Sequence, residues 1–246
     1  MIKVLLLNGS PRANNSGTFA ILSALEEGMK EAGKNKRTEI VHLYEKDIHH
    51  CCGCYSCWIK TPGKCIFEDD MTELLKDFVE ADIIVFGTPL YHYTMSSIMK
   101  KFIERTLPLD EPWLIPHPYR PERTAHPVRY NKKQQTLLVS TCGFLELENF
   151  DSLVHTFRHY ASMTFDDYIG EILCTYAEIL SRKEGKEIGA FYLEKVKKAG
   201  KEIVENGEIS DELKEELNKG IFDIDKETCY QLAEEYWKMR MEDEDE

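Results

Sequence analysis

Five short apolar segments recur along the chain, separated by stretches whose apolar residues repeat with helical spacing. Short apolar runs of this kind are typical of strands that are buried on both faces of a sheet. The predicted strands cover residues 3–8, 38–44, 82–91, 134–143 and 167–176, and the predicted helices cover residues 18–30, 71–81, 96–106 and 149–163. Strands that alternate with helices predict an α/β fold with a doubly wound parallel sheet and right-handed crossovers.

One long segment departs from this alternation. Residues 107–133 contain six of the nine prolines, which argues against a regular helix or a central strand. The segment is also too long for an ordinary connection, so we expect a lid or an oligomer arm. His117 and His126 lie in this arm and are expected on the surface.

Helical periodicity returns toward the C-terminus, over residues 186–206, 211–219 and 226–240. The chain then ends in the acidic tail MEDEDE, which is typical of a solvated segment. We therefore expect a domain over residues 1–180, followed by a C-terminal helical extension over residues 181–246.

The net charge of −13 disfavours nucleic acid and anionic membrane surfaces as partners, because both are bound through clusters of Lys and Arg. The sequence contains no window of 18 apolar residues, and its N-terminal apolar run is too short for a signal peptide. We expect a cytoplasmic protein. Thiols are normally reduced there, so clustered cysteines favour metal or redox chemistry over structural disulfides.

The polar loop GSPRANNSGT follows the first predicted strand and leads into a helix. Free backbone amides at a helix N-terminus attract anions, and a monophosphate group such as that of FMN suits this loop. Neither the Walker pattern nor GxGxxG is present, so a tightly held dinucleotide is not indicated. The alternative is a capped strand-to-helix loop without a ligand.

The segment CCGCYSCWIKTPGKC, residues 51–65, holds five of the eight cysteines. Cys51, Cys54, Cys57 and Cys65 have the spacing C-x2-C-x2-C-x7-C, which approaches the ferredoxin pattern for a [4Fe–4S] cluster. Cys52 is then surplus. Free or redox-active thiols are one alternative, and zinc with the adjacent histidines is another.

Four motifs in order resemble the flavodoxin-like NAD(P)H-dependent FMN reductases. These are NGSPR with SGT after the first strand, TPLYHYTMSSIMKKFIER over residues 88–105, STCGF over residues 140–144, and the cysteine segment followed by EDDM. The last resembles the iron–sulfur flavoprotein branch. The resemblance covers about residues 3–180 and implies a five-stranded sheet of order 2-1-3-4-5, with FMN at the switch point between strands one and three.

The resemblance also implies which residues contact the cofactors. The phosphate would be held by Ser10, Arg12, Ser16, Gly17 and Thr18. The ring would lie between one loop formed by Thr88, Pro89, Leu90, Tyr91 and His92 and another formed by Ser140, Thr141, Cys142 and Gly143. The cluster ligands would be Cys51, Cys54, Cys57 and Cys65 in a loop near the flavin edge. No residue is assigned to acid–base catalysis, and Tyr91 and His92 are candidates for tuning the flavin.

We therefore expect an NAD(P)H-dependent flavin oxidoreductase that passes electrons through FMN and a [4Fe–4S] cluster to a small-molecule or protein acceptor. NAD(P)H would bind transiently over the flavin. One alternative is a cluster-free NAD(P)H:FMN or quinone-type reductase. Another is a flavodoxin-like electron carrier without its own nicotinamide reaction. The family resemblance implies a homodimer or homotetramer.

Overall fold

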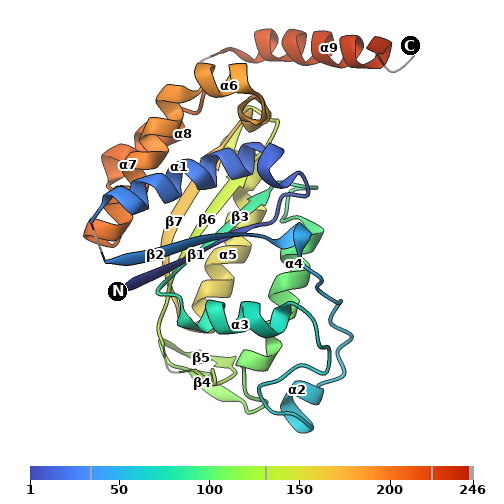
Figure 1. The fold of residues 1–246 in the computed structure, drawn as a ribbon, viewed down its shortest axis with the longest axis vertical. Coiled ribbons are helices and arrows are strands. Elements are labelled where there is room, and N and C mark those ends of the chain that lie inside the picture. Colours follow the sequence, from blue (N-terminus) through green and yellow to red (C-terminus); the bar gives the residue numbers. More distant parts are fainter. Residues whose placement is uncertain (34, 131, 223, 244–246) are drawn as a thin grey trace.

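The computed structural model describes residues 1–33, 35–130, 132–222 and 224–243. A five-stranded sheet runs through its centre, and all of its neighbouring strands pair in parallel (Figure 1). The strand order is β2 (Lys36–His42), β1 (Ile2–Asn8), β3 (Ile83–Pro89), β6 (Gln135–Thr141) and β7 (Asp167–Cys174). Numbered within this sheet alone, the order is 2-1-3-4-5, which confirms the predicted flavodoxin-like topology.

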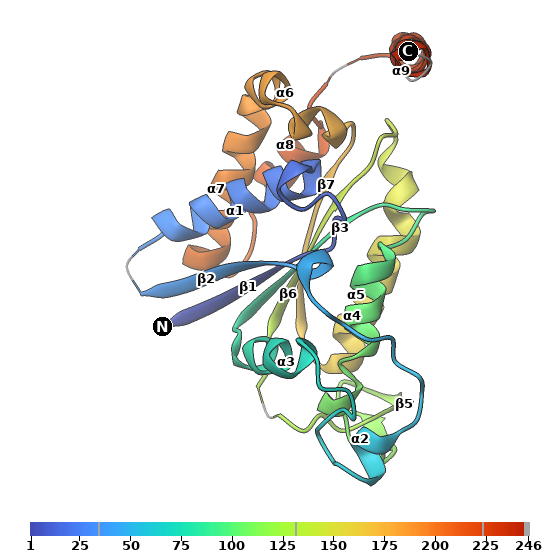
Figure 2. The same cartoon turned by 45° about the vertical axis from the view of Figure 1, so that its right-hand side comes forward.

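Helices cover both faces of the sheet (Figure 2). One core packs alternate strand residues, such as Leu6 and Val85, against α1 (Gly17–Glu31), α7 (Ala190–Asn206) and α8 (Asp211–Asn218). The other core packs the intervening residues, such as Leu7 and Phe86, against α3 (Met71–Glu80), α4 (Ser97–Glu104) and α5 (Asp151–Thr164). This division follows from the period of two in strand side chains, because successive residues point to opposite faces of the sheet and both faces are covered by helices.

Helix α7 lies directly against α1, although the two helices are separated by most of the chain (Figure 1). Gly28 of α1 faces the backbone of Lys197, and Gly200 of α7 faces the backbone of Leu25. A Cβ atom at either glycine would overlap the opposing carbonyl oxygen. The two glycines therefore permit the close approach of the helices.

The C-terminal region is helical, as predicted, but its first long helix belongs to the central core. Tyr192, Val196, Ala199 and Ile203 of α7 are buried in the same cluster as β1 and α1. Shorter segments precede α7, namely a 3-10 turn at Ala177–Ser181 and α6 (Lys183–Ile188). Helix α9 (Lys226–Asp243) lies apart from the sheet (Figures 1 and 2). The last three residues of the acidic tail lie outside the described residues.

In the part of the chain that the structure describes, no helix is long and apolar enough to cross a membrane.

The proline-rich arm forms a small antiparallel hairpin of β4 (Ile115–His117) and β5 (Arg120–Ala125), separate from the main sheet. The absence of a central strand or regular helix among the described residues of this segment agrees with its proline content. The expected exposure of His117 is wrong, because this side chain is buried. Its Nδ1 accepts hydrogen bonds from the backbone N–H groups of Tyr119 and Arg120, so its Nε2–H donates to the carbonyl oxygen of Ser162 at 2.7 Å.

The contact between α1 and α7 predicts that Gly200→Ala destabilises the protein. On an exposed helical surface this change would add about 1 kcal/mol of helix propensity, but here the new methyl group overlaps the Leu25 carbonyl. We expect a loss of about 1–3 kcal/mol in the free energy of unfolding, measured by urea denaturation. Gly143→Ala is the control, since no atom lies within 4 Å of the position that its new Cβ would take. Equal stability of the two variants would contradict this account.

Candidate functional site

The loops after β1, β3 and β6 meet at the carboxyl edge of the sheet and are joined by hydrogen bonds. Ser96 donates its hydroxyl to the Gly9 carbonyl at 2.6 Å and its backbone N–H to Thr88 Oγ1 at 2.9 Å. The Ser140 hydroxyl donates to the Thr88 carbonyl at 2.8 Å. Thr88, Ser96 and Ser140 are buried, so these bonds are shielded from water and fix the three loops relative to one another.

A second link joins the first loop to the last. The hydroxyl oxygens of Thr18 and Thr141 lie 2.8 Å apart, and both side chains are buried. The side chain of Asn8, at the end of β1, accepts the backbone N–H of Ser10 at 3.0 Å. The chain's own polar groups therefore hold this edge of the sheet in shape.

Helix α1 points its N-terminus at this edge. Ser16 is the N-cap residue, and its hydroxyl accepts the backbone N–H of Phe19 at 3.1 Å and donates to the Ala13 carbonyl at 2.9 Å. The N–H groups of Gly17 and Thr18 belong to the first turn, where the helix itself offers no acceptor. This end of the helix carries the positive part of the helix dipole and suits an anion.

The sequence places Arg12 at the same anion position, but its side chain has another partner here. The guanidinium forms an ion pair with Glu178 at 2.9 Å, and both groups are exposed. The backbone around Ser16, Gly17 and Thr18 is therefore the better placed anion site of this loop.

A tight turn follows β3. Tyr91 and Thr94 exchange both backbone hydrogen bonds, and the two residues between them, His92 and Tyr93, have φ angles of 46° and 64°. Two positive φ angles are typical of a type I′ turn, which normally contains Gly, Asn or Asp. The strained backbone holds Tyr91, His92 and Tyr93 out from the end of the sheet, a kind of strain found at functional sites.

Two aromatic side chains face each other across this edge. The rings of Tyr93 and Phe144 are parallel to within 1°, and their centroids lie 6.2 Å apart. The two residues are 55% and 50% exposed. Neither is among the predicted site residues. Phe144 ends the STCGF motif, but only the fold shows that it faces the turn after β3.

Cys142 and Gly143 lie between these elements. Burial raises the pKa of the Cys142 thiol to about 11, so this thiol is protonated and does not act as a nucleophile. Beside it, Gly143 has open space around its Cα. The structure thus brings together the predicted residues of all three strand-end loops, which are Ser10, Ser16, Gly17, Thr18, Thr88, Pro89, Leu90, Tyr91, His92, Ser140, Thr141, Cys142 and Gly143.

The cysteine segment surrounds a cavity of its own. Cys51, Cys52, Cys54, Cys57 and Cys65 all line it, and all are free thiols. Gly53 and Tyr55 have left-handed backbones that curl the chain into α2 (Ser56–Ile59). Gly63, with φ of 82°, lies in the turn after Pro62 that returns the chain to Cys65.

The environments of two of these thiols differ. The Ser56 hydroxyl and backbone N–H lower the pKa of Cys54, which favours its thiolate. Burial raises the pKa of Cys57, and the nearby Cys65, Cys51 and Cys54 raise it further. Cys57 therefore lies near the other three predicted ligands, which line the same cavity.

A buried ion pair borders this cavity and was not predicted from the sequence. Arg105 follows α4, and its guanidinium donates to both carboxylate oxygens of Asp69, at 2.6 and 3.0 Å. Arg105 also donates to the His49 carbonyl at 2.8 Å. The two side chains are 2% and 0% exposed. The motif EDDM contains Asp69, but its partner is identified only by the fold.

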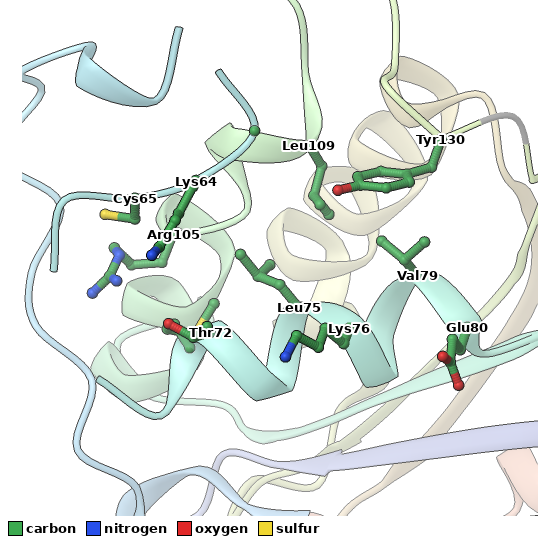
Figure 3. Close-up of a pocket in the computed structure, with 12 residues that line it drawn as sticks. Lys64, Cys65, Thr72, Leu75, Lys76, Val79, Glu80, Arg105, Leu109 and Tyr130 are labelled. Carbon is green, nitrogen blue, oxygen red and sulfur yellow. The ribbon is translucent and has the colours of Figure 1, made fainter. Parts of the chain in front are cut away.

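A second cavity of about 510 Å³ adjoins the first, since Cys65 and Arg105 line both. Figure 3 shows Leu75 and Val79 of α3 below this space, Leu109 and Tyr130 above it, and Cys65 and Arg105 at one end.

The cysteine cavity does not lie at the strand-end loops within one chain. Ser96 at the start of α4 contacts those loops, whereas Arg105 at its end borders the cysteines. Helix α4 has eight residues, so it spans about 12 Å. The expectation that the cysteine loop lies near the flavin edge is therefore not met within this chain.

Comparison with known proteins agrees with this architecture. Residues 2–116 match the family described as NADPH-dependent FMN reductase. An iron–sulfur flavoprotein of Methanocaldococcus jannaschii is 37% identical over 112 residues, which cover 44% of this chain and 53% of that protein. One of Archaeoglobus fulgidus is 37% identical over 105 residues, covering 43% of this chain and 49% of that protein. The match thus spans about half the length of these curated relatives.

Solved structures extend the likeness to most of the fold. An FMN-dependent NADH-azoreductase from Bacillus anthracis, in complex with FMN, superimposes with a TM-score of 0.59 at 16% identity, covering 83% of this chain and all of that one. An NAD(P)H:quinone oxidoreductase from Methanothermobacter marburgensis superimposes with a TM-score of 0.54 at 16% identity, covering 82% and 94% of the two chains. At these identities the likeness concerns the fold alone.

The sheet order and the strand-end loops show a flavodoxin-like fold, and within it residues 2–116 are similar to the NADPH-dependent FMN reductase family and to curated iron–sulfur flavoproteins.

Proposed function

We propose that this protein is an FMN-dependent oxidoreductase of the iron–sulfur flavoprotein type. The observation that carries the proposal is the convergence of three hydrogen-bonded strand-end loops on the N-terminus of α1. Open parallel sheets bind their ligands at this edge. The description of the family that matches residues 2–116 and the names of the curated relatives support flavin chemistry.

In this proposal the chain holds FMN through its own backbone and loops. The N–H groups of Gly17 and Thr18 bind the phosphate, and the turn at Tyr91–Thr94 and the loop at Cys142–Phe144 flank the ring. FMN, when bound, accepts a hydride from NAD(P)H and releases electrons singly. The protein orients the ring and keeps water from one side of it.

The cysteine cavity fits a polynuclear cluster better than a single ion. The described part of the chain holds no group of three or more His, Cys, Asp or Glu side chains placed around one ion. In a [4Fe–4S] cluster each cysteine binds a different iron, so the thiolates are further apart than around a single ion. The cysteines that line this cavity agree with that donor set. Cys51, Cys54, Cys57 and Cys65 would then be the ligands.

The remaining parts of the proposal concern the partners. Electrons would leave toward a small-molecule or protein acceptor, in the cytoplasm, where thiols are reduced. We also propose a homodimer or homotetramer, supported by the exposed Trp113, Leu114 and Tyr119 around the β4–β5 hairpin.

A cluster-free NAD(P)H:quinone-type reductase is the second candidate. It is supported by the names of relatives such as the NAD(P)H:quinone oxidoreductase from Methanothermobacter marburgensis.

The spectrum of anaerobically purified protein, with iron and acid-labile sulfide measured on the same sample, distinguishes the two candidates. Flavin bands with about four irons per chain support the iron–sulfur flavoprotein. Flavin bands without iron support the cluster-free reductase. Protein without flavin contradicts both.

The anion site predicts the effect of Ser16→Asp on FMN binding. Aspartate caps a helix as well as serine does, so we expect α1 to be retained, although the carboxylate cannot donate the bond that the Ser16 hydroxyl gives to the Ala13 carbonyl. Its carboxylate would repel the FMN phosphate, and we expect FMN affinity to fall at least tenfold, about 1.4 kcal/mol, by fluorescence titration. Riboflavin lacks the phosphate and should bind the variant and the native protein alike. A similar loss for riboflavin would place the phosphate elsewhere.

The ligand assignment predicts that Cys54→Ser loses iron but keeps FMN. The cysteine cavity is separated from the strand-end loops by α4, so the flavin content should not change. Cys52→Ser is the matched control, since it removes a neighbouring thiol that the ligand spacing does not use. Iron and flavin are measured per chain for both variants. Full iron content in Cys54→Ser would show the ligand assignment to be wrong.

A further inference from the structure

The terminal nitrogens of the Arg105 guanidinium form hydrogen bonds, but its Nε–H forms none within the described part of the chain. Both of its terminal nitrogens donate hydrogen bonds, to Asp69 and to the His49 carbonyl. Its Nε is buried and has no hydrogen-bond partner among the described residues. In a well-formed protein such a donor is rare, because an unpaired buried N–H costs free energy. The free donor therefore points to an acceptor that does not lie within hydrogen-bond distance among the described residues.

The position of Arg105 shows where that partner lies. Arg105 lines the cysteine cavity together with all five cysteines of the segment. Figure 3 shows its guanidinium directed to the same side as the Cys65 sulfur and away from the larger cavity. A guanidinium is always charged in proteins, so Arg105 presents a positive charge to the cavity that Cys65 also lines.

Asp69 fixes the orientation of the Arg105 guanidinium. Its carboxylate accepts the two bonds from Arg105 and further bonds from the backbone N–H groups of His49 at 2.9 Å and Met71 at 3.1 Å. Burial alone would raise the pKa of Asp69, but the bonds from Arg105 and His49 lower it to about 2. Above that pH, Asp69 is a fixed anion behind a fixed cation, with the cation nearer to the cysteines.

We propose that Arg105 is a positioning residue for the cysteine-bound cluster, donating its Nε–H to a thiolate or cluster sulfur beside Cys65 and so favouring the reduced cluster. The inference rests on the proposed function, since it requires a cluster in the cavity. Hydrogen bonds and positive charge at the sulfurs raise the reduction potential of iron–sulfur clusters. The proposed effect of Arg105 is electrostatic: it would keep its proton and its hydrogen bonds whether a bound cluster is oxidised or reduced by one electron.

The test compares the midpoint potentials of variant proteins that hold their cluster, by spectroscopic titration with dithionite. Arg105→Gln removes the charge and leaves Asp69 uncompensated, so we expect the cluster's reduction equilibrium constant to fall at least tenfold, or about 59 mV for one electron. Arg105→Lys keeps the charge without the Nε–H, and we expect a smaller decrease. Asp69→Asn removes the anion behind Arg105, and we expect the potential to rise.

The opposite signs separate this proposal from a purely structural ion pair. Loss of packing would disturb the cavity in both Arg105 and Asp69 variants and would shift their potentials in the same direction or not at all. Arg158→Gln is the matched control for net charge, because Arg158 pairs with Glu171 outside the cysteine cavity. Its potential should equal that of the native protein.

Two outcomes overturn the proposal. Unchanged potentials in Arg105→Gln and Asp69→Asn do so, as do shifts of the same sign. If Arg105→Gln does not retain iron, the comparison of Arg105→Lys with Asp69→Asn decides by the same criterion. If the native protein contains no iron or sulfide, the proposed cluster itself is contradicted. The iron and sulfide assay of the native protein therefore precedes the measurement of any variant.

Discussion

The hydroxyl group of Ser96 holds together the part of the molecule on which the candidate site depends. It accepts the backbone N–H of Met99 as the cap of α4 and donates to the carbonyl of Gly9, while its backbone N–H binds Thr88. One residue thus fixes the start of a helix, the loop after β1 and the end of β3. Since α4 is rigid over its eight residues, the position of Arg105 at its other end is fixed as well.

The positions of the two proposed cofactor sites are therefore coupled through α4. The strand-end loops are ordered by bonds among buried hydroxyl groups, and the cysteine segment is ordered by left-handed residues and the Arg105–Asp69 pair. Pre-formed sites of this kind spend little of their binding energy on ordering the protein. The charged pair is a costly element in a buried position, which agrees with a role beyond packing.

The strands of the main sheet and most of the helices could be predicted from apolar periodicity, because they contribute residues to the two cores. The order of the strands followed from the resemblance to a known family. The strand-end loops followed from the geometry of parallel sheets. The pairing of Arg105 with Asp69, the facing rings of Tyr93 and Phe144 and the burial of His117 could not be predicted. Each depends on contacts between distant segments, for which the local pattern carries no signal.

The contact between α1 and α7 bears on how the chain reaches its native state. Ile21, Leu22, Leu25 and Met29 of α1 are fully buried, and α7 covers them only after more than 150 further residues have been made. During synthesis the apolar face of α1 therefore stays uncovered until α7 has been made. Long-range closure of this kind slows folding and leaves apolar surface accessible to chaperones and to aggregation. The helical region beyond residue 180 therefore completes the flavodoxin-like core only after the rest of that core has been made.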